Sequence, residues 1–197
     1  MKLGNSPAEE LPWEYDKKIR SVVQVSFAMV VIGSLQQISI TSPYVQALVL
    51  RCITALFILL ISTFFIRKTR YLFTDLKQEK WYILLSYFLW FLPFLSVRFS
   101  SEIWSGVLFL WMISLYLEKD ISKRNIFLMG FLAAVSFLVR FQIAFALVGF
   151  FSWLFFIKEE SKRFYLKFSM AFIMVLILGF LLDSWFYETL TCTPLNY

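Results

Sequence analysis

The sequence has no histidine and only two cysteines, and charged residues make up just 16% of its 197 positions. Cys52 and Cys192 are far apart and form no Cys-x-x-Cys pair. Without histidine they do not make a zinc ligand set, so no metal site is expected. The chain also has no Gly-rich phosphate loop and no Gly-x-Ser-x-Gly motif. These absences exclude the common soluble nucleotide-binding enzymes and serine hydrolases.

Apolar residues are what the chain has in excess. Hydrophobic residues make up 60% of it, with 24 Phe and 7 Trp. A small soluble domain cannot hide that much apolar surface in its core. The composition predicts an all-α protein, a polytopic transmembrane helical bundle. The net charge of +6 then reflects the excess of Lys and Arg in cytoplasmic loops of membrane proteins, so no nucleic-acid partner is expected.

Basic residues are concentrated in three linkers between apolar runs. The long runs cover residues 45–66, 81–97, 103–117, 126–157 and 166–182. Most of the 19 Lys and Arg residues lie in linkers 67–80, 118–125 and 158–167. The positive-inside rule assigns all three linkers to the cytoplasmic side. The run over 22–35 is about 14 residues, too short to span, and is predicted to lie in the membrane interface.

This assignment requires a break within the run over 126–157. As one helix, its 32 residues would extend about 48 Å, against about 30 Å of hydrocarbon. Arg140 and Gln142 lie near its middle, and splitting there keeps both flanking basic linkers on the cytoplasmic side. The prediction is therefore a single membrane domain with about six spanning helices and an N-terminal interfacial helix. Its parts are an exterior polar segment (1–21), the interfacial helix and loop (22–43), the transmembrane helices (44–182) and an exterior loop (183–197).

In this topology the remaining polar segments all fall on the exterior side. Arg140 is a costly residue inside a membrane and therefore has a partner or a task. It either binds an anionic group such as a lipid phosphate, or snorkels or pairs with Glu102 or Asp183. In Arg98-Phe-Ser-Ser-Glu102, a serine can cap the next helix and Glu102 suits its first turn. Capping does not explain Arg98, which could meet a phosphate or a sugar hydroxyl.

Two further polar segments flank the apolar region. Trp13, Glu14 and Arg20 precede the interfacial run and form an amphipathic approach to the membrane. Asp183, expected to be exposed at a helix end, is followed by Trp185 and Tyr187. Trp and Tyr at such a border commonly anchor a helix at the headgroups, so substrate binding and anchoring both remain open for this segment.

The order of these polar segments resembles the GT-C type mannosyltransferases that use a polyprenyl-phosphate sugar. The resemblance lies in Leu-Pro-Trp-Glu-Tyr and Ile-Arg-Ser within 11–21, Arg-Phe-Ser-Ser-Glu at 98–102, Phe-Leu-Val-Arg-Phe-Gln at 137–142, and Leu-Asp-Ser-Trp-Phe-Tyr at 182–187 with Pro-Leu-Asn-Tyr at 194–197. It covers essentially the whole chain and implies a GT-C-like fold.

The resemblance also implies functional roles. The donor would be a polyprenyl-phosphate-linked sugar, the acceptor a glycolipid or glycan, and the surroundings membrane lipid, with no cofactor or metal. Arg140 and Arg98 are the candidates for the donor phosphate. The full set of candidate donor-phosphate and substrate-binding residues is Arg140, Arg98, Gln142, Glu102, Trp13, Glu14, Arg20, Asp183 and Tyr187.

The chain also departs from the family pattern. The family's catalytic acid lies in a His-Pro-Asp-Glu-like motif upstream of the Trp-Glu-Tyr segment, and that motif is missing here, so the catalytic residue is unknown. The expectation is an internal piece of a longer enzyme, with no turnover by this chain alone. The alternatives are a non-catalytic membrane protein (a transporter piece or lipid-binding scaffold) and an inactive truncated gene product. In each case a multi-pass protein of a bacterial inner membrane or the endoplasmic reticulum is expected.

Overall fold

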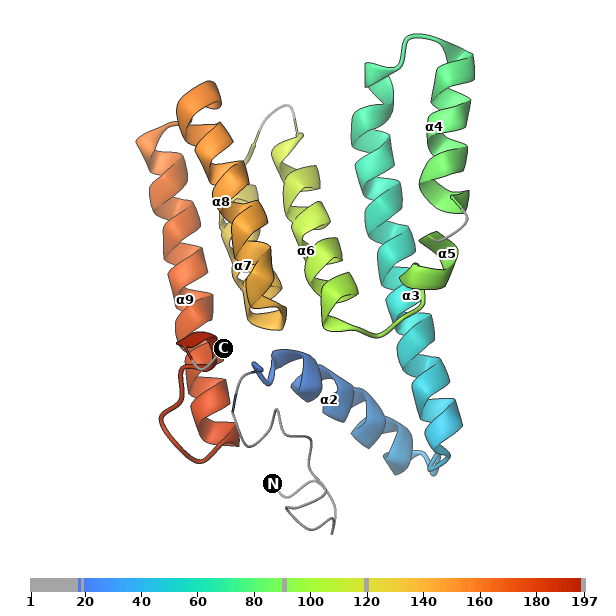
Figure 1. Ribbon diagram of the computed structural model, residues 1–197, viewed down its shortest axis with the longest axis vertical. Coiled ribbons are helices and arrows are strands. Elements are labelled where there is room, and N and C mark those ends of the chain that lie inside the picture. Colours follow the sequence, from blue (N-terminus) through green and yellow to red (C-terminus); the bar gives the residue numbers. More distant parts are fainter. Residues whose placement is uncertain (1–17, 19, 90–91, 119–120, 196–197) are drawn as a thin grey trace.

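The computed structural model describes residues 18, 20–89, 92–118 and 121–195. Every regular element in these ranges is helical (Figure 1). The α-helices are α2 (Val23–Gln37), α3 (Pro43–Thr69), α4 (Leu76–Phe88), α5 (Leu92–Ser96), α6 (Ser101–Tyr116), α7 (Lys123–Val139), α8 (Ala144–Trp153) and α9 (Lys162–Phe186). The predicted all-α class is confirmed.

Three helical segments are long and apolar enough to cross a membrane. They are Pro43–Leu72, Phe141–Lys158 and Lys162–Phe186. The first adds the short η2 turn (Arg70–Leu72) to α3, and the second joins the η3 turn (Phe141–Ile143), α8 and the π-helical η4 (Leu154–Lys158). The helices α2 and α6 are apolar but shorter. The chain is a multi-pass integral membrane protein.

The predicted single span over 81–97 is wrong. The helix α4 ends at Phe88, and Leu89 has extended backbone angles (φ −57°, ψ 127°). A separate helix, α5, begins at Leu92 and has Pro93 as its second residue. Proline has no N–H to donate and is tolerated in a first helical turn, where that donor has no partner in any case. The prediction was made from the apolar run alone and did not take Pro93 into account.

The helices form two groups, which meet where α3 of one group packs against α6 of the other. In Figure 1, α6, α7, α8 and α9 lie together, and α3, α4 and α5 form the second group beside them. The core of the first group contains Met112 of α6, Met129 and Leu132 of α7, and Phe164 and Phe168 of α9. All five side chains are at most 3% exposed. Packing between α6, α7 and α9 therefore forms the body that the other helices adjoin.

The predicted break at Arg140 is confirmed. The helix α7 ends at Val139, and Arg140 itself is extended (φ −154°, ψ 112°) before the chain reverses into η3 and α8. Figure 1 accordingly shows the C-terminal ends of α3, α6 and α8 at one end of the molecule. The basic linkers of the sequence lie at or directly after these three helix ends. The opposite end, here called the exterior end, holds α2, the start of α6, the end of α7 and the end of α9. Arg140 directly follows α7.

The helix α2 lies across this exterior end, at a steep angle to the other helices (Figure 1). Its 15 residues contain no Asp, Glu, Lys or Arg. An apolar helix too short to span and lying across the ends of others has the expected form of an interfacial helix. The prediction for the run over 22–35 agrees with this arrangement.

Maleimide labelling tests the orientation of the chain. Glu188 and Glu159 are both exposed and lie at opposite ends of α9. With Cys52 and Cys192 replaced by serine, Glu188→Cys should react with an impermeant maleimide added to sealed right-side-out vesicles. Glu159→Cys should react only after permeabilisation, because its linker is cytoplasmic under the positive-inside rule. The reverse pattern would invert the topology.

Candidate functional site

Two serines bring the exterior ends of α6 and α7 together. The Ser105 hydroxyl donates to the carbonyl oxygen of Ser136 (3.0 Å), and the Ser136 hydroxyl donates to the carbonyl oxygen of Ser105 (2.7 Å). Both serines are buried. Glu102 lies one turn before Ser105, and Arg140 lies one turn after Ser136. The reciprocal hydrogen bonds thus set two charged residues side by side at the exterior end.

Arg140 and Glu102 form an ion pair there. Arg140 Nη1 lies 2.5 Å from Glu102 Oε1 and donates to Ser101 Oγ at 3.3 Å. The side chains of Arg140 and Glu102 remain 30% and 56% exposed. Of the two pairings left open by the sequence, the one with Glu102 is present. Both contacts use a single terminal nitrogen, so the rest of the guanidinium fork can bind an anion.

A small pocket of about 340 Å³ lies between α2 and the start of α6. We call it the polar pocket because most of its lining residues are polar or charged, although apolar atoms still make up the larger part of its surface. Its lining residues come from these two segments: Arg20, Gln24, Val25, Ala28, Phe99, Ser100, Ser101 and Glu102. Ser100 occupies the N-cap position of α6, but its side chain makes no capping hydrogen bond. The predicted serine cap is therefore wrong, and the Glu102 carboxylate instead accepts from its own backbone N–H in the first turn of α6.

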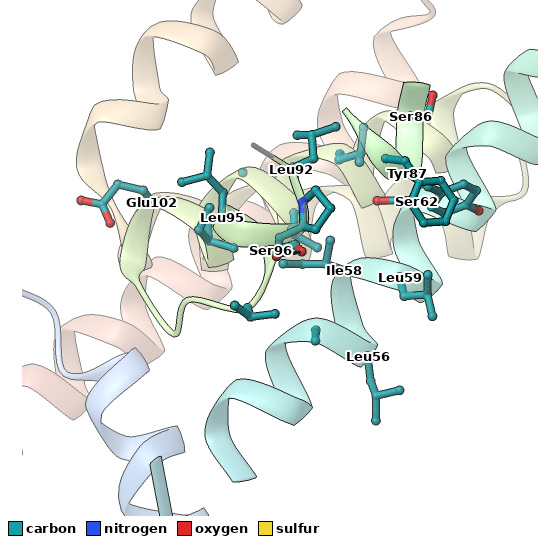
Figure 2. A pocket seen from close by; sticks show the side chains of 18 residues that line it. Leu56, Ile58, Leu59, Ser62, Ser86, Tyr87, Leu92, Leu95, Ser96 and Glu102 are labelled. Atoms are coloured by element: carbon teal, nitrogen blue, oxygen red, sulfur yellow. Dashed lines mark hydrogen bonds between the residues drawn. The ribbon is translucent and has the colours of Figure 1, made fainter. Parts of the chain in front are cut away.

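A much larger groove of about 800 Å³ runs beside this pocket. It is mostly apolar and is lined by α3, α4, α5 and α6. Figure 2 shows Glu102 at one end of it, Leu92 and Leu95 in the middle, and Tyr87 toward the other end. Two of the helices that line the groove, α3 and α6, are joined by a hydrogen bond from Trp104 Nε1–H to Thr54 Oγ1 (3.1 Å). Because Glu102 lines both cavities, the apolar groove ends where the polar pocket begins.

Arg98 lies on the connection between α5 and α6. Its neighbours on either side are Val97, which lines the groove, and Phe99, which lines the pocket. The side chain is exposed, and its guanidinium makes no hydrogen bond or ion pair with the residues that the structure describes. Arg98 is thus an exposed cation close to both cavities, and its assignment to an anion stays a prediction.

Asp183 was expected to be exposed, and that expectation is wrong. Asp183 is only 1% exposed. Its carboxylate accepts hydrogen bonds from the Ser21 hydroxyl (3.0 Å), the Val22 N–H (2.8 Å) and the Thr193 hydroxyl (2.8 Å). A buried carboxylate must be hydrogen-bonded to be tolerated. Two of the three donors, on Ser21 and Val22, come from a segment that is remote in sequence. The predicted direct contact with substrate is not supported by this placement.

The other candidates divide into three groups. Tyr187 donates its hydroxyl hydrogen bond to the Arg20 carbonyl (3.0 Å), so it contacts the segment before α2. Gln142 is exposed in η3, two residues beyond Arg140. Trp13 and Glu14 lie outside the described residues.

Sequence reasoning gave no place in the site to Gln24, Ser101, Ser21 or Thr193. Gln24 carried a signal as a polar residue interrupting an apolar run, Ser101 was considered as a helix cap, and Ser21 belongs to the Ile-Arg-Ser stretch of the resemblance. Within the described ranges no group of three His, Cys, Asp or Glu side chains could hold a metal ion.

Fold and site together define a class: a multi-pass helical membrane protein whose polar site adjoins an apolar groove. A comparison with known families matches residues 6–197 to the Alg9-like mannosyltransferase family. The chain belongs to this family, and membership implies a membrane mannosyltransferase. The resemblance to GT-C type mannosyltransferases is thereby confirmed. The same comparisons find no matching curated protein and no matching solved structure.

Proposed function

We propose that this chain binds a polyprenyl-phosphate mannose, of the dolichol type, and serves in transferring the mannose to a glycolipid or glycan acceptor on the non-cytoplasmic face. The observation that carries the proposal is the position of Glu102. It lines an apolar groove and a polar pocket at once, and it is paired with Arg140. A donor with an apolar chain, a phosphate and a sugar needs these environments in this order.

The phosphate defines what the cations must do. In transfer, the bond between the anomeric carbon and the phosphate oxygen breaks, and the polyprenyl phosphate leaves with the electron pair. The acceptor oxygen bonds to that carbon, and the acceptor hydroxyl gives its proton to a general base. Negative charge therefore develops on the phosphate, where fixed cations stabilise it most in a site with little water. Arg140 and Arg98 would hold the phosphate oxygens by charge-assisted hydrogen bonds. Two observations support this role: Arg140 is paired with Glu102, and Arg98 follows Val97, and both Glu102 and Val97 line the groove.

The groove supplies shape for the prenyl chain. Lipid tails outside the protein are as apolar as the groove. Moving the prenyl chain from the lipid into the groove therefore gains little free energy. What the groove provides is a fixed path from the lipid to the pocket. Gly106 of α6 lines this path, and a Cβ built on it would meet no atom within 4 Å. A large side chain at this position would therefore fill the groove without displacing the backbone.

Filling the groove with Gly106→Phe should weaken binding of a long-chain polyprenyl-phosphate mannose about tenfold, equal to about 1.4 kcal/mol. Binding of a short-chain, water-soluble analogue should stay unchanged, because only the long chain needs the path. Gly149→Phe on α8 is the matched control, since Gly149 is also open to an added Cβ and lies outside this groove. Titration of the purified chain in detergent measures both affinities.

The outcomes separate the proposal from its alternatives. An equal loss of both donors would place the effect in the pocket, and no loss of either would place the prenyl chain elsewhere. Membranes that contain the protein as expressed from its own gene (the native gene product) should also form a mannosylated lipid or glycan from labelled donor. A transporter piece or lipid scaffold would bind donor without forming that product.

A further inference from the structure

The helix α2 begins without a capping side chain of its own. Val22 occupies the N-cap position and cannot accept a hydrogen bond through its side chain. The first turn of α2 also contains no acidic residue. The N–H groups of a first helical turn have no partner within the helix, and they carry partial positive charge. A buried helix start of this kind needs an acceptor from another part of the chain.

Asp183 of α9 provides that acceptor. Its Oδ1 accepts from the Val22 N–H at 2.8 Å and from the Ser21 hydroxyl at 3.0 Å, while Oδ2 accepts from Thr193. The residue is 1% exposed and makes no ion pair with a described Lys or Arg. Asp183 lies in the last turn of α9, where the helix dipole disfavours a negative charge. Its place is therefore explained by the start of α2 and not by its own helix.

The same end of α9 also contacts the residue next to this start. Tyr187 donates to the Arg20 carbonyl at 3.0 Å. Arg20 and Gln24 flank the capped residues on either side, and both line the polar pocket with Glu102. Fixing residues 20–22 against α9 therefore fixes the α2 side of the pocket.

We propose that Asp183 is a positioning residue: a cap supplied by α9 that holds α2 so that Arg20 and Gln24 face Glu102 across the pocket. The assignment of the pocket to substrate rests on the proposed function. The orientation of α2 does not depend on it and can be measured separately.

Spin-label distances test the orientation. Gln36 on α2 and Phe145 on α8 are exposed, so labels at Gln36→Cys and Phe145→Cys, with Cys52 and Cys192 replaced by serine, report how α2 lies against the bundle. The parent protein should give a single narrow distribution of distances between the two labels, and Asp183→Ala should broaden that distribution. Asp183→Asn should restore it, because asparagine caps a helix about as well as aspartate and its amide can donate to Thr193. Thr193→Val, a milder change, should broaden it partly.

The functional readout is the KM for the donor in membranes carrying the native gene product. Asp183→Ala should raise the KM about tenfold, the scale of one lost helix cap, and Asp183→Asn should restore it. The matched control is Asp75→Ala, which removes a helix cap at the opposite end of the molecule, where the Asp75 side chain accepts from the Lys77 N–H. This control should leave both KM and the distance unchanged.

These results test the capping role of Asp183 and the proposed function separately. A narrow distance in both Asp183→Ala and Thr193→Val would overturn the capping role. Failure of Asp183→Asn to rescue would overturn it as well, since the charge and not the hydrogen bonds would then be required. A broadened distance with no mannosyl transfer even in the parent protein would support the capping role and contradict the proposed function.

Discussion

Arg140→Ala is expected to lower the affinity for polyprenyl-phosphate mannose by about 10- to 100-fold. Charge-assisted hydrogen bonds contribute about 1.5–3 kcal/mol each, and the substitution removes the donors that we assign to the phosphate. It also removes the ion-pair partner of Glu102, so that the less compensated carboxylate repels the phosphate at the same place. In the native gene product, transfer itself should fall by about 100-fold or more, the scale for losing a donor to developing charge.

The double variant Arg140→Ala with Glu102→Ala separates these two effects. Removing the carboxylate should recover part of the lost affinity, while the loss of the phosphate contact remains. Arg163→Ala is the matched control, because Arg163 is exposed in the first turn of α9, in a basic linker at the opposite end. Alkaline extraction of membranes checks that all variants insert. An unchanged donor affinity in Arg140→Ala would contradict the assignment of Arg140 to the phosphate.

Gly130→Ala is expected to destabilise the protein by about 1–3 kcal/mol, the usual cost of overpacking. A Cβ on Gly130 of α7 would collide with the Phe168 carbonyl oxygen of α9 and would lie 2.9 Å from the Ala171 Cβ. Because one of these atoms belongs to the backbone, no side-chain rotation relieves the contact, and α7 and α9 must move apart. These two helices lead to Arg140 and Asp183, so the site should be disturbed as well.

Gly149→Ala is the control for this change. Gly149 lies in α8, and an added Cβ there meets no atom within 4 Å. Since alanine is the better helix former, the variant should match the parent or gain up to about 1 kcal/mol. Thermal unfolding of both variants in the same detergent measures the difference. Equal melting temperatures for Gly130→Ala and Gly149→Ala would show that α7 and α9 do not pack as closely as described.

Hydropathy and charge by themselves determined the helical class, the interfacial helix and the break at Arg140. These features are local: an apolar run either reaches across a membrane or does not, and an internal charge interrupts it. The order of the polar segments was also enough to show the resemblance to the mannosyltransferases, since a motif is read along the chain.

Only the tertiary structure decided which polar residues meet. Asp183 lies more than 160 positions from Ser21 and Val22, yet its carboxylate accepts from both. Arg140 pairs with Glu102 and not with Asp183 because Ser105 and Ser136 hold α6 against α7. Such contacts depend on how helices pack side by side, and the spacing of residues along one helix contains no information about the face that a distant helix presents. The adjoining groove and pocket are consequences of that packing.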